Sequence, residues 1–487
     1  MTTSIPPTLR VPFVGVQFDG SQAQQGPALL VYRAILFVQK LSTGAAAPDT
    51  FVRATGVADA IAACGRGSQA HRAGIGWFAS NKTTELWLGV LADPTSGAIA
   101  SGTIVVGGTA TAGGTIPLYA GGVLVAVGVN VGDAAAIIAG NIASAINGNP
   151  DLPVTASATA ATVTITFRHK GALGNGYDVR NCFNAGEALP AGVTLTSTVL
   201  AGGTGAPSLT NLISAMDPLW FQIWSHPYTD ATSLTAIEGE LASRLGPMRS
   251  IDGLAITSAS GTLSALATLG ASRNSPSSVI VAQPGANPLT PSWEFAAEVA
   301  ALVAREGAID PARPFQTLAL SNAMPVAELD QFNPAERDLL LHDGIATTKL
   351  AAGGVVQLER IITTYQTNPS GQPDATYLDA TTMLTLQYLR YAFRVLFANK
   401  YPRHKLADDG TRFEPGQPVM TPSLARAEAL TWFGDMEGLG LVEDADQFKR
   451  DLVVVRSKTD PSRLEFLIPP NLVNGLVVVA ADLQFRL

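Results

Sequence analysis

Short apolar runs alternate with amphipathic stretches in two separated parts of the chain, residues 27–93 and 207–373. The runs suit strands, at 28–39, 85–91, 220–224, 251–257, 278–282 and 316–320. The amphipathic stretches suit helices, at 57–63, 68–81, 232–245, 262–269 and 292–305. Alternation of this kind is typical of βαβ units around a largely parallel sheet. The two parts therefore predict one central α/β domain that is split by an insertion.

The segment between them, residues 94–206, has a different pattern. Short runs of Val, Thr and Ile lie between glycine clusters, at 103–106, 123–129, 162–167 and 193–200. An alanine-rich stretch at 133–146 predicts one helix, with Asp133 as its N-cap because a short acidic side chain can accept the first free backbone N–H groups. We expect an inserted β-rich module that carries a single helix.

The pattern changes again after residue 374. A long helical stretch at 376–399 is followed by a second at 422–434, and then by strand-like runs at 452–455 and 463–467. Residues 374–471 therefore predict a C-terminal α+β domain. Together these patterns give an α/β multidomain chain.

Both ends of the chain read as extended strands without a partner nearby. Residues 1–26 form the predicted N-terminal arm and residues 472–487 the C-terminal arm. Their apolar positions are Val11, Phe13, Val14, Val16, Phe18, Leu476, Val478, Leu483, Phe485 and Leu487. An apolar strand with an unpaired backbone is an aggregation hazard. We expect these arms to add to a sheet of another copy; the alternative is that each folds back on its own chain.

Composition strengthens the expectation of self-assembly. Charged residues make up only 14% of the 487 residues, and apolar residues 47%. Roughly a quarter charged is usual for soluble domains, so much of the surface is expected to be buried against other copies or to be neutral and polar. The charges are uneven: seven lie in residues 94–216 and 28 in residues 374–487.

Charge and cysteine content exclude several classes of function. A net charge of −8 argues against a nucleic-acid-binding role for the whole chain. Cys64 and Cys182 are far apart and the five histidines show no ligand spacing, so we expect no disulfide framework, metal or cofactor. The first residues lack a signal-peptide pattern and no run suits a membrane helix, which predicts synthesis in a cytoplasm without membrane insertion.

Candidate chemistry is sparse. His226, Asp252 and Ser258 follow or flank predicted strands and could be drawn as a hydrolase triad, but any chain of this length offers such a trio. A cluster of cations is more distinctive and is called here the basic stripe: Arg390, Arg394, Lys400, Arg403 and Lys405. It predicts either a docking face for an acidic partner or a solvated helix end where cations favour the dipole.

Several segments resemble the tail sheath proteins of Mu-like contractile phages. They are residues 10–19 (RVPFVGVQFD), 24–28 (QQGPA), 168–175 (RHKGALGN), 401–413 (YPRHKLADDGTRF) and 483–487 (LQFRL). The resemblance covers nearly the whole chain, and the 401–413 segment is the most specific part of it.

The resemblance implies a structural protein, not an enzyme, with a subtilisin-like central domain that is not a working protease. It implies stacked hexameric rings around a tail tube in the virion, assembled in the host cytoplasm, with baseplate and tail terminator proteins as further partners. The arms would add strands to the C-terminal domains of neighbours. Residues 374–471 would face the tube and residues 94–206 would face outward. Sheaths of phage-derived bacteriocins or secretion-type machines remain the alternative, and a subtilisin-fold hydrolase is a more distant one.

Overall fold

The computed structural model describes residues 30–285, 288–414 and 416–486. The described residues divide into two compact units, one made of residues 31–387 with 474–486 and the other built around residues 388–473. The predicted N-terminal arm, with Val11, Phe13, Val14, Val16 and Phe18, lies outside the described residues, as does Leu487.

A six-stranded sheet forms the centre of the larger unit, in the order β13-β12-β11-β1-β3-β2. Its strands are β1 (Arg33–Gln39), β2 (Thr50–Ala54), β3 (Glu85–Leu91), β11 (Ile223–Ser225), β12 (Leu254–Ala259) and β13 (Ser278–Ala282). All neighbours are parallel except β2, which runs antiparallel to β3. The two sequence stretches do form one sheet, and the mixed α/β class is confirmed.

Helices pack around this sheet: α1 (Val57–Cys64), α2 (Gln69–Ser80), α4 (Thr210–Ala215), α5 (Ala231–Leu245), α6 (Leu263–Ala271), α7 (Ser292–Ile309) and α8 (Pro334–His342). Asp230 and Thr262 cap α5 and α6 by accepting backbone N–H groups three residues later. Helix α7 is buried along most of its length and packs against α2. A hairpin of β14 (Thr347–Ala351) and β15 (Val355–Arg360) follows α8.

The prediction of a strand at 316–320 is wrong. Only Ala319 forms a bridge there, to Gln357. Thr317 has a φ of 69°, which lies in the left-handed region and breaks the extended backbone that a strand needs. The alternation of apolar residues was present, but a left-handed residue inside the run interrupts it.

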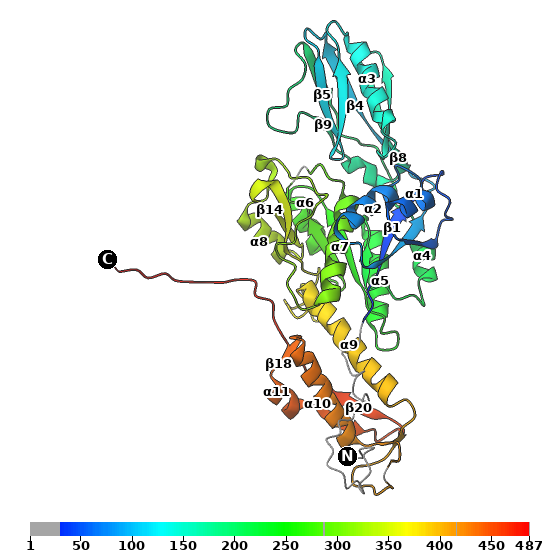
Figure 1. Cartoon of the computed structure of the whole chain (residues 1–487), viewed down its shortest axis with the longest axis vertical. Coiled ribbons are helices and arrows are strands. Elements are labelled where there is room, and N and C mark those ends of the chain that lie inside the picture. The colour runs from blue at the N-terminus through cyan, green and yellow to red at the C-terminus, as the bar shows by residue number, and fades with distance from the viewer. Residues whose placement is uncertain (1–29, 286–287, 415, 487) are drawn as a thin grey trace, which may run out of the picture. The chain divides into compact units, whose positions relative to one another are not determined.

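The insertion contains two sheets, one α-helix and a short 3-10 helix at Ala172–Gly176 (Figure 1). A four-stranded sheet has the order β10-β4-β8-β7 and a three-stranded sheet has the order β6-β5-β9. The elements are β4 (Ile99–Gly108), β5 (Gly114–Ala120), β6 (Val123–Val129), α3 (Ala135–Gly148), β7 (Val154–Thr159), β8 (Thr162–Lys170), β9 (Val179–Asn181) and β10 (Val193–Ser197). Alternate residues of β6 and β8 are buried, and Ile138, Ile142 and Ile146 of α3 are buried as well.

Helix α3 begins differently from the prediction. Its N-cap position is Ala134, which makes no capping bond, so Asp133 is not the N-cap. The Asp133 carboxylate instead accepts the backbone N–H of Asn130 at 2.8 Å, which stabilises the turn before the helix.

Two asparagines of α3 cap edge strands of the insertion. The Asn147 side chain donates to the carbonyl of Ala156 at 2.7 Å and accepts the N–H of the same residue at 2.9 Å, on edge strand β7. The Asn141 amide donates to the carbonyl of Gly128 on edge strand β6 at 3.3 Å. These bonds occupy backbone groups that would otherwise be open to another strand.

The insertion packs against the central α/β core through buried contacts. The Tyr177 ring stacks on Trp293 of α7 with centroids 6.3 Å apart. His169 at the end of β8 accepts the backbone N–H of Gln69 through Nε2 at 2.9 Å, and its Nδ1 lies 2.8 Å from the Asp93 carboxylate.

A buried ion pair within the core lies close to Tyr177. Arg72 of α2 donates from Nε and Nη2 to the two Glu294 oxygens, each at 2.7 Å. Glu294 is 1% exposed, so burial raises the pKa of its carboxyl while Arg72 limits that rise. The pair joins α2 to α7 beside Tyr177, whose own pKa is raised by burial and lowered in part by Arg72.

The second unit contains the C-terminal helices. Helix α9 (Ala380–Lys400) crosses the boundary between the two units. The other elements are β16 (Lys405–Leu406), β17 (Val419–Met420), α10 (Pro422–Gly438), β18 (Val442–Glu443), α11 (Ala445–Asp451), β19 (Val453–Arg456), β20 (Leu464–Leu467) and β21 (Asn471–Leu472). Each of its three small sheets has two strands. Phe433 of α10 stacks on Phe448 of α11 at a centroid distance of 4.0 Å.

We predict that Glu294→Ala destabilises the larger unit strongly. Removing one partner of a buried ion pair leaves the other charge without compensation, which typically costs about 3–5 kcal/mol. Urea unfolding followed by tryptophan fluorescence measures the loss. The double variant Arg72→Met/Glu294→Leu, which removes both charges, should recover most of it. Equal destabilisation by the single and double variants would contradict this account.

We predict that Asn147→Ala weakens the insertion and opens the β7 edge. Each lost hydrogen bond contributes about 0.5–1.5 kcal/mol, and the change removes two of them. Thermal unfolding and light scattering measure stability and aggregation. Asn141→Ala is the matched control, since it removes one longer bond from the same helix and should have the smaller effect. A larger effect at Asn141 would argue against edge capping by Asn147.

Candidate assembly surfaces

The C-terminal arm leaves its apolar side chains uncovered in this chain. After β21, residues 473–486 form neither helix nor strand. Exposed fractions are 70% for Leu476, 77% for Val478, 89% for Leu483 and 79% for Phe485. The arm touches its own unit near its start, where Gln316 donates to the carbonyl of Leu476 at 3.2 Å. Of the strand predicted at 472–487, Leu472 pairs with Val442 and the Val473 N–H donates to the Leu441 carbonyl, whereas residues 474–486 form no strand.

The hairpin of β19 and β20 is a second surface with open apolar positions. One face packs inward, where Phe466 contacts the rings of Phe393 and Phe397 with centroids 5.3 Å from each. The other face carries Val453, opposite Leu467 in the register, and both are exposed. A sheet of two strands is only marginally stable by itself. This hairpin therefore has the geometry of a sheet that can accept further strands.

The basic stripe is only partly brought together. Arg390, Arg394 and Lys400 lie on α9, whereas Arg403 and Lys405 follow it in a turn and in β16. Lys400 is neutralised by Glu428 of α10, with Nζ and Oε2 2.7 Å apart, and this contact raises the pKa of Lys400. Lys405 donates to the Gln417 side chain at 3.0 Å. Local sequence patterns do not point to Glu428 as the partner of Lys400, because it lies 28 residues further on.

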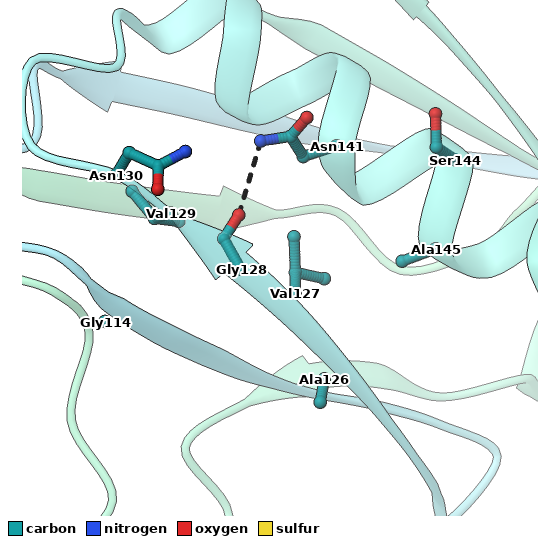
Figure 2. A pocket seen from close by; sticks show the side chains of 9 residues that line it. All are labelled: Gly114, Ala126, Val127, Gly128, Val129, Asn130, Asn141, Ser144 and Ala145. Atoms are coloured by element: carbon teal, nitrogen blue, oxygen red, sulfur yellow. Dashed lines mark hydrogen bonds between the residues drawn. The ribbon is translucent and has the colours of Figure 1, made fainter.

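A shallow groove of about 460 Å³ lies between β6 and α3 in the insertion (Figure 2). Its lining is small and uncharged: Gly114, Ala126, Val127, Gly128, Val129, Asn130, Asn141, Ser144 and Ala145. Figure 2 shows the Asn141 amide directed at the Gly128 carbonyl across the groove. The residues that line the groove include no pair of an acid or base with a nucleophile at catalytic spacing. On its β6 edge, the Gly128 carbonyl already accepts a hydrogen bond from Asn141.

The hydrolase alternative has no support in the geometry. The Ser258 hydroxyl donates to the backbone carbonyl of Ser292 at 2.8 Å. Neither ring nitrogen of His226 has a hydrogen-bond partner among the described residues, and burial lowers its pKa to about 4. A nucleophile and its base must be hydrogen-bonded or close to it, and these two side chains are engaged elsewhere or isolated.

Within residues 30–285, 288–414 and 416–486, no three side chains of the His, Cys, Asp or Glu type are grouped so that they could hold a metal ion. In the same ranges, no helix combines the length and apolarity that a membrane span requires.

Comparison with known proteins gives consistent results along the chain. The family model for the phage tail sheath protein central domain matches residues 202–364, and that for the phage tail sheath C-terminal domain matches residues 372–486. A Mu-like prophage FluMu tail sheath protein from Haemophilus influenzae is 38% identical over 484 residues, which is 99% of each chain.

Solved structures with some similarity are also sheath proteins. The sheath tail protein from Desulfitobacterium hafniense is 13% identical, with a TM-score of 0.48 over 95% of this chain and 100% of that one. The sheath tail protein Lin1278 from Listeria innocua is 14% identical, with a TM-score of 0.49 over 92% and 97% of the two chains. These values are too low to carry an assignment.

The full-length relative and the two matching domains confirm the resemblance noted in the sequence, and with it the expectation of a structural subunit in place of an enzyme. The identity extends through the insertion and both termini, because the alignment covers 99% of the chain. This chain belongs to the phage tail sheath protein family, in its Mu-like branch.

Proposed function

We propose that this chain polymerises as stacked hexameric rings around a tail tube, and that contraction of the polymer drives the tube through the host envelope. The observation that carries the proposal is the uncovered C-terminal arm, with Leu483 and Phe485 almost fully exposed. A chain that keeps such a segment in water needs another surface to bury it. Other copies of the chain are the natural source of that surface.

The arm would add to the β19–β20 hairpin of a neighbouring copy. Strand addition uses backbone hydrogen bonds for affinity and alternate side chains for register. Burying Leu476, Val478, Leu483 and Phe485 contributes roughly 1.5–3 kcal/mol each, against the entropy lost when the segment is ordered. The N-terminal arm would act in the same way. Contacts of this head-to-tail kind generate rings or helices in preference to closed dimers.

The remaining regions would divide the other roles. Residues 374–471 would face the tail tube, with the basic stripe as a contact, and residues 94–206 would face outward. The split central domain would have the subtilisin-like arrangement without protease activity. Baseplate and tail terminator proteins would be further partners in the virion tail, after assembly in the host cytoplasm. The sheath of a phage-derived bacteriocin or a secretion-type machine would use the same surfaces.

Contraction would be a physical change without chemical catalysis. We infer an extended polymer held by a kinetic barrier, whose domains move as rigid bodies while the arm contacts persist as hinges. The stack of Tyr177 on Trp293 and the contacts of His169 with Gln69 and Asp93 support movement of the insertion together with the central sheet.

We predict that deleting residues 475–487 leaves a folded subunit that does not polymerise. The deletion removes exposed side chains that make few contacts within the chain, so circular dichroism and the unfolding midpoint should stay near the wild-type values. Electron microscopy and sedimentation should show tubes for the wild type and none for the deletion. Normal tubes from the deleted chain would rule out the arm as a link.

A point-mutation version of this test uses Leu483→Asp with Phe485→Asp. Leu329→Asp is the matched control, since Leu329 is fully exposed in the same unit but lies outside the arm. The arm variant should lose polymerisation and the control should keep it. If both variants lose it equally, the effect comes from added charge and the role assigned to the arm is wrong.

We predict that Arg403→Glu with Lys405→Glu weakens binding to tube protein and spares contacts between sheath subunits. These two positions are exposed, and they avoid placing a new carboxylate opposite Glu428. Co-sedimentation with purified tube protein at low salt measures the effect. Lys449→Glu with Arg450→Glu gives the same charge change on α11 and should bind as the wild type does. Unchanged binding by the Arg403/Lys405 variant would remove the stripe from the tube contact.

A further inference from the structure

A cavity of about 350 Å³ lies in the larger unit at the carboxyl ends of β1 and β11. Gln39, the last residue of β1, lines it together with residues 228–230, which follow β11. From these two neighbouring strands the chain continues in opposite directions across the sheet, from β1 toward β3 and from β11 toward β12. Ligands of α/β proteins bind in the crevice at such a reversal of strand order. The cavity therefore lies where a sheet of this kind most readily holds a small molecule.

Three parts of the chain form the walls of this cavity. They are the loop after β11, residues 171–173 at the start of the short 3-10 helix of the insertion, and residues 205–207, which return from the insertion to the core. The Ala172 N–H donates to the Gly205 carbonyl at 2.9 Å, which joins two of these walls. The apolar side chains on the walls belong to Ala172, Leu173, Ala206 and Pro207. Small-molecule sites usually have volumes of about 300–1,000 Å³, so this cavity suits a compact ligand with an apolar body.

The Gln39 side chain supplies the cavity with a fixed hydrogen-bond acceptor. Its Nε2 donates to an Asp93 oxygen at 2.8 Å and to the Lys170 carbonyl at 3.1 Å. Both partners are acceptors, so the amide nitrogen must lie on their side and the amide oxygen on the other. Gln39 is 1% exposed, and no described residue donates to its side-chain oxygen. An acceptor that lines a cavity and has no donor in the protein is available to an N–H group of a ligand.

Negative charge accompanies this acceptor. Asp230 lines the cavity and is exposed, and one of its oxygens accepts the Ser233 N–H at 2.9 Å as the N-cap of α5. Burial, and then the charges of Asp93 and Asp230, raise the pKa of Tyr228, so both carboxylates act on this side of the cavity. No Lys or Arg is among the lining residues, and the Lys170 Nζ lies 3.5 Å from a backbone carbonyl outside the lining.

We propose that this cavity binds a small organic cation that carries a primary ammonium group on an apolar body. The ammonium donates to the Gln39 oxygen and to the Asp230 carboxylate, and the apolar body packs against Leu173 and Pro207. Hydrogen bonds to a charged group are about twice as strong as neutral ones. The positive end of the α5 dipole amounts to about half a charge, which is less than the full negative charge of Asp230.

The site goes beyond the proposed function, because it needs no second copy of the chain. A ligand in this cavity contacts the insertion, the returning segment and the loop after β11 together. Since a ligand that binds only the folded state stabilises it, occupancy of the site should strengthen the attachment of the insertion to the core.

Isothermal titration calorimetry of the full chain with hexylamine tests the site. We expect saturable binding of one molecule per chain and a higher midpoint of thermal unfolding. Hexanol and hexanoate share the apolar chain but lack the ammonium, and both should bind roughly tenfold more weakly or worse. The inference is overturned if hexylamine shows no saturable binding, or if hexanol or hexanoate binds as tightly.

The first test variant is Asp230→Asn, which removes the charge but keeps the N-cap, because Asn caps helices as well as Asp does. Its affinity for hexylamine should fall roughly tenfold or more, with circular dichroism unchanged. Asp444→Asn is the matched control, since Asp444 is exposed and caps α11 by accepting the Gln447 N–H, away from the cavity. The control should bind as the wild type does. Undiminished binding by the folded Asp230→Asn variant, or an equal loss in the control, contradicts the inference.

Ala206→Phe is a second variant in case Asp230→Asn folds poorly. It fills the apolar part of the cavity without changing the charge, so hexylamine binding should be lost while the unfolding midpoint without ligand stays near the wild-type value. Wild-type binding by this folded variant would place the amine elsewhere and overturn the inference. All these measurements use the unpolymerised chain, so their failure leaves the role proposed for the arms untouched, and failure of polymerisation does not affect them.

Discussion

The pairing of β1 with β11 is the contact on which the larger unit depends. It places Ala34 opposite Ile223, so two stretches separated by the whole insertion become neighbours in one sheet. Strand β1 also pairs with β3 on its other side, and the sheet is complete only when both halves meet. Contacts between such distant segments need their loop closed first. The chain therefore has to accommodate a folded insertion between two strands of its own core.

The core surface against which the insertion packs depends on the pairing of β1 with β11. Arg72 lies on α2, after β1, and Glu294 on α7, after β13, so their bond forms only once both halves of the sheet are in place. The insertion then adds Tyr177 against Trp293 of the same helix. The insertion is attached to this core by the stacked ring pair and by the contacts of His169 with the Gln69 backbone and the Asp93 carboxylate.

Sequence patterns predicted where the helices and strands of the core lie better than they predicted which residues contact each other. The predicted strands at 85–91 and 278–282 match β3 and β13 to the residue, because each is a short apolar run with polar residues close to both ends. Strand β2 was missed, since its five residues show no clear periodicity. The left-handed Thr317 and the pairing of Lys400 with Glu428 depend on tertiary context, which no local pattern reports. The exposure of the C-terminal arm could be anticipated, because an apolar strand after two prolines has no local partner.

Strand edges are capped by side chains in the insertion, whereas the β19–β20 hairpin of the C-terminal unit is a small sheet with exposed apolar residues. In the insertion, Asn141 and Asn147 occupy edge groups of β6 and β7, which discourages added strands. In the C-terminal unit, β19 and β20 form a sheet of two strands with exposed Val453 and Leu467. A protein that polymerises through strand addition must restrict that addition to one kind of edge, or copies would join in many registers. Because Asn141 and Asn147 cap the insertion, the β19–β20 hairpin is the more favourable acceptor for an added strand.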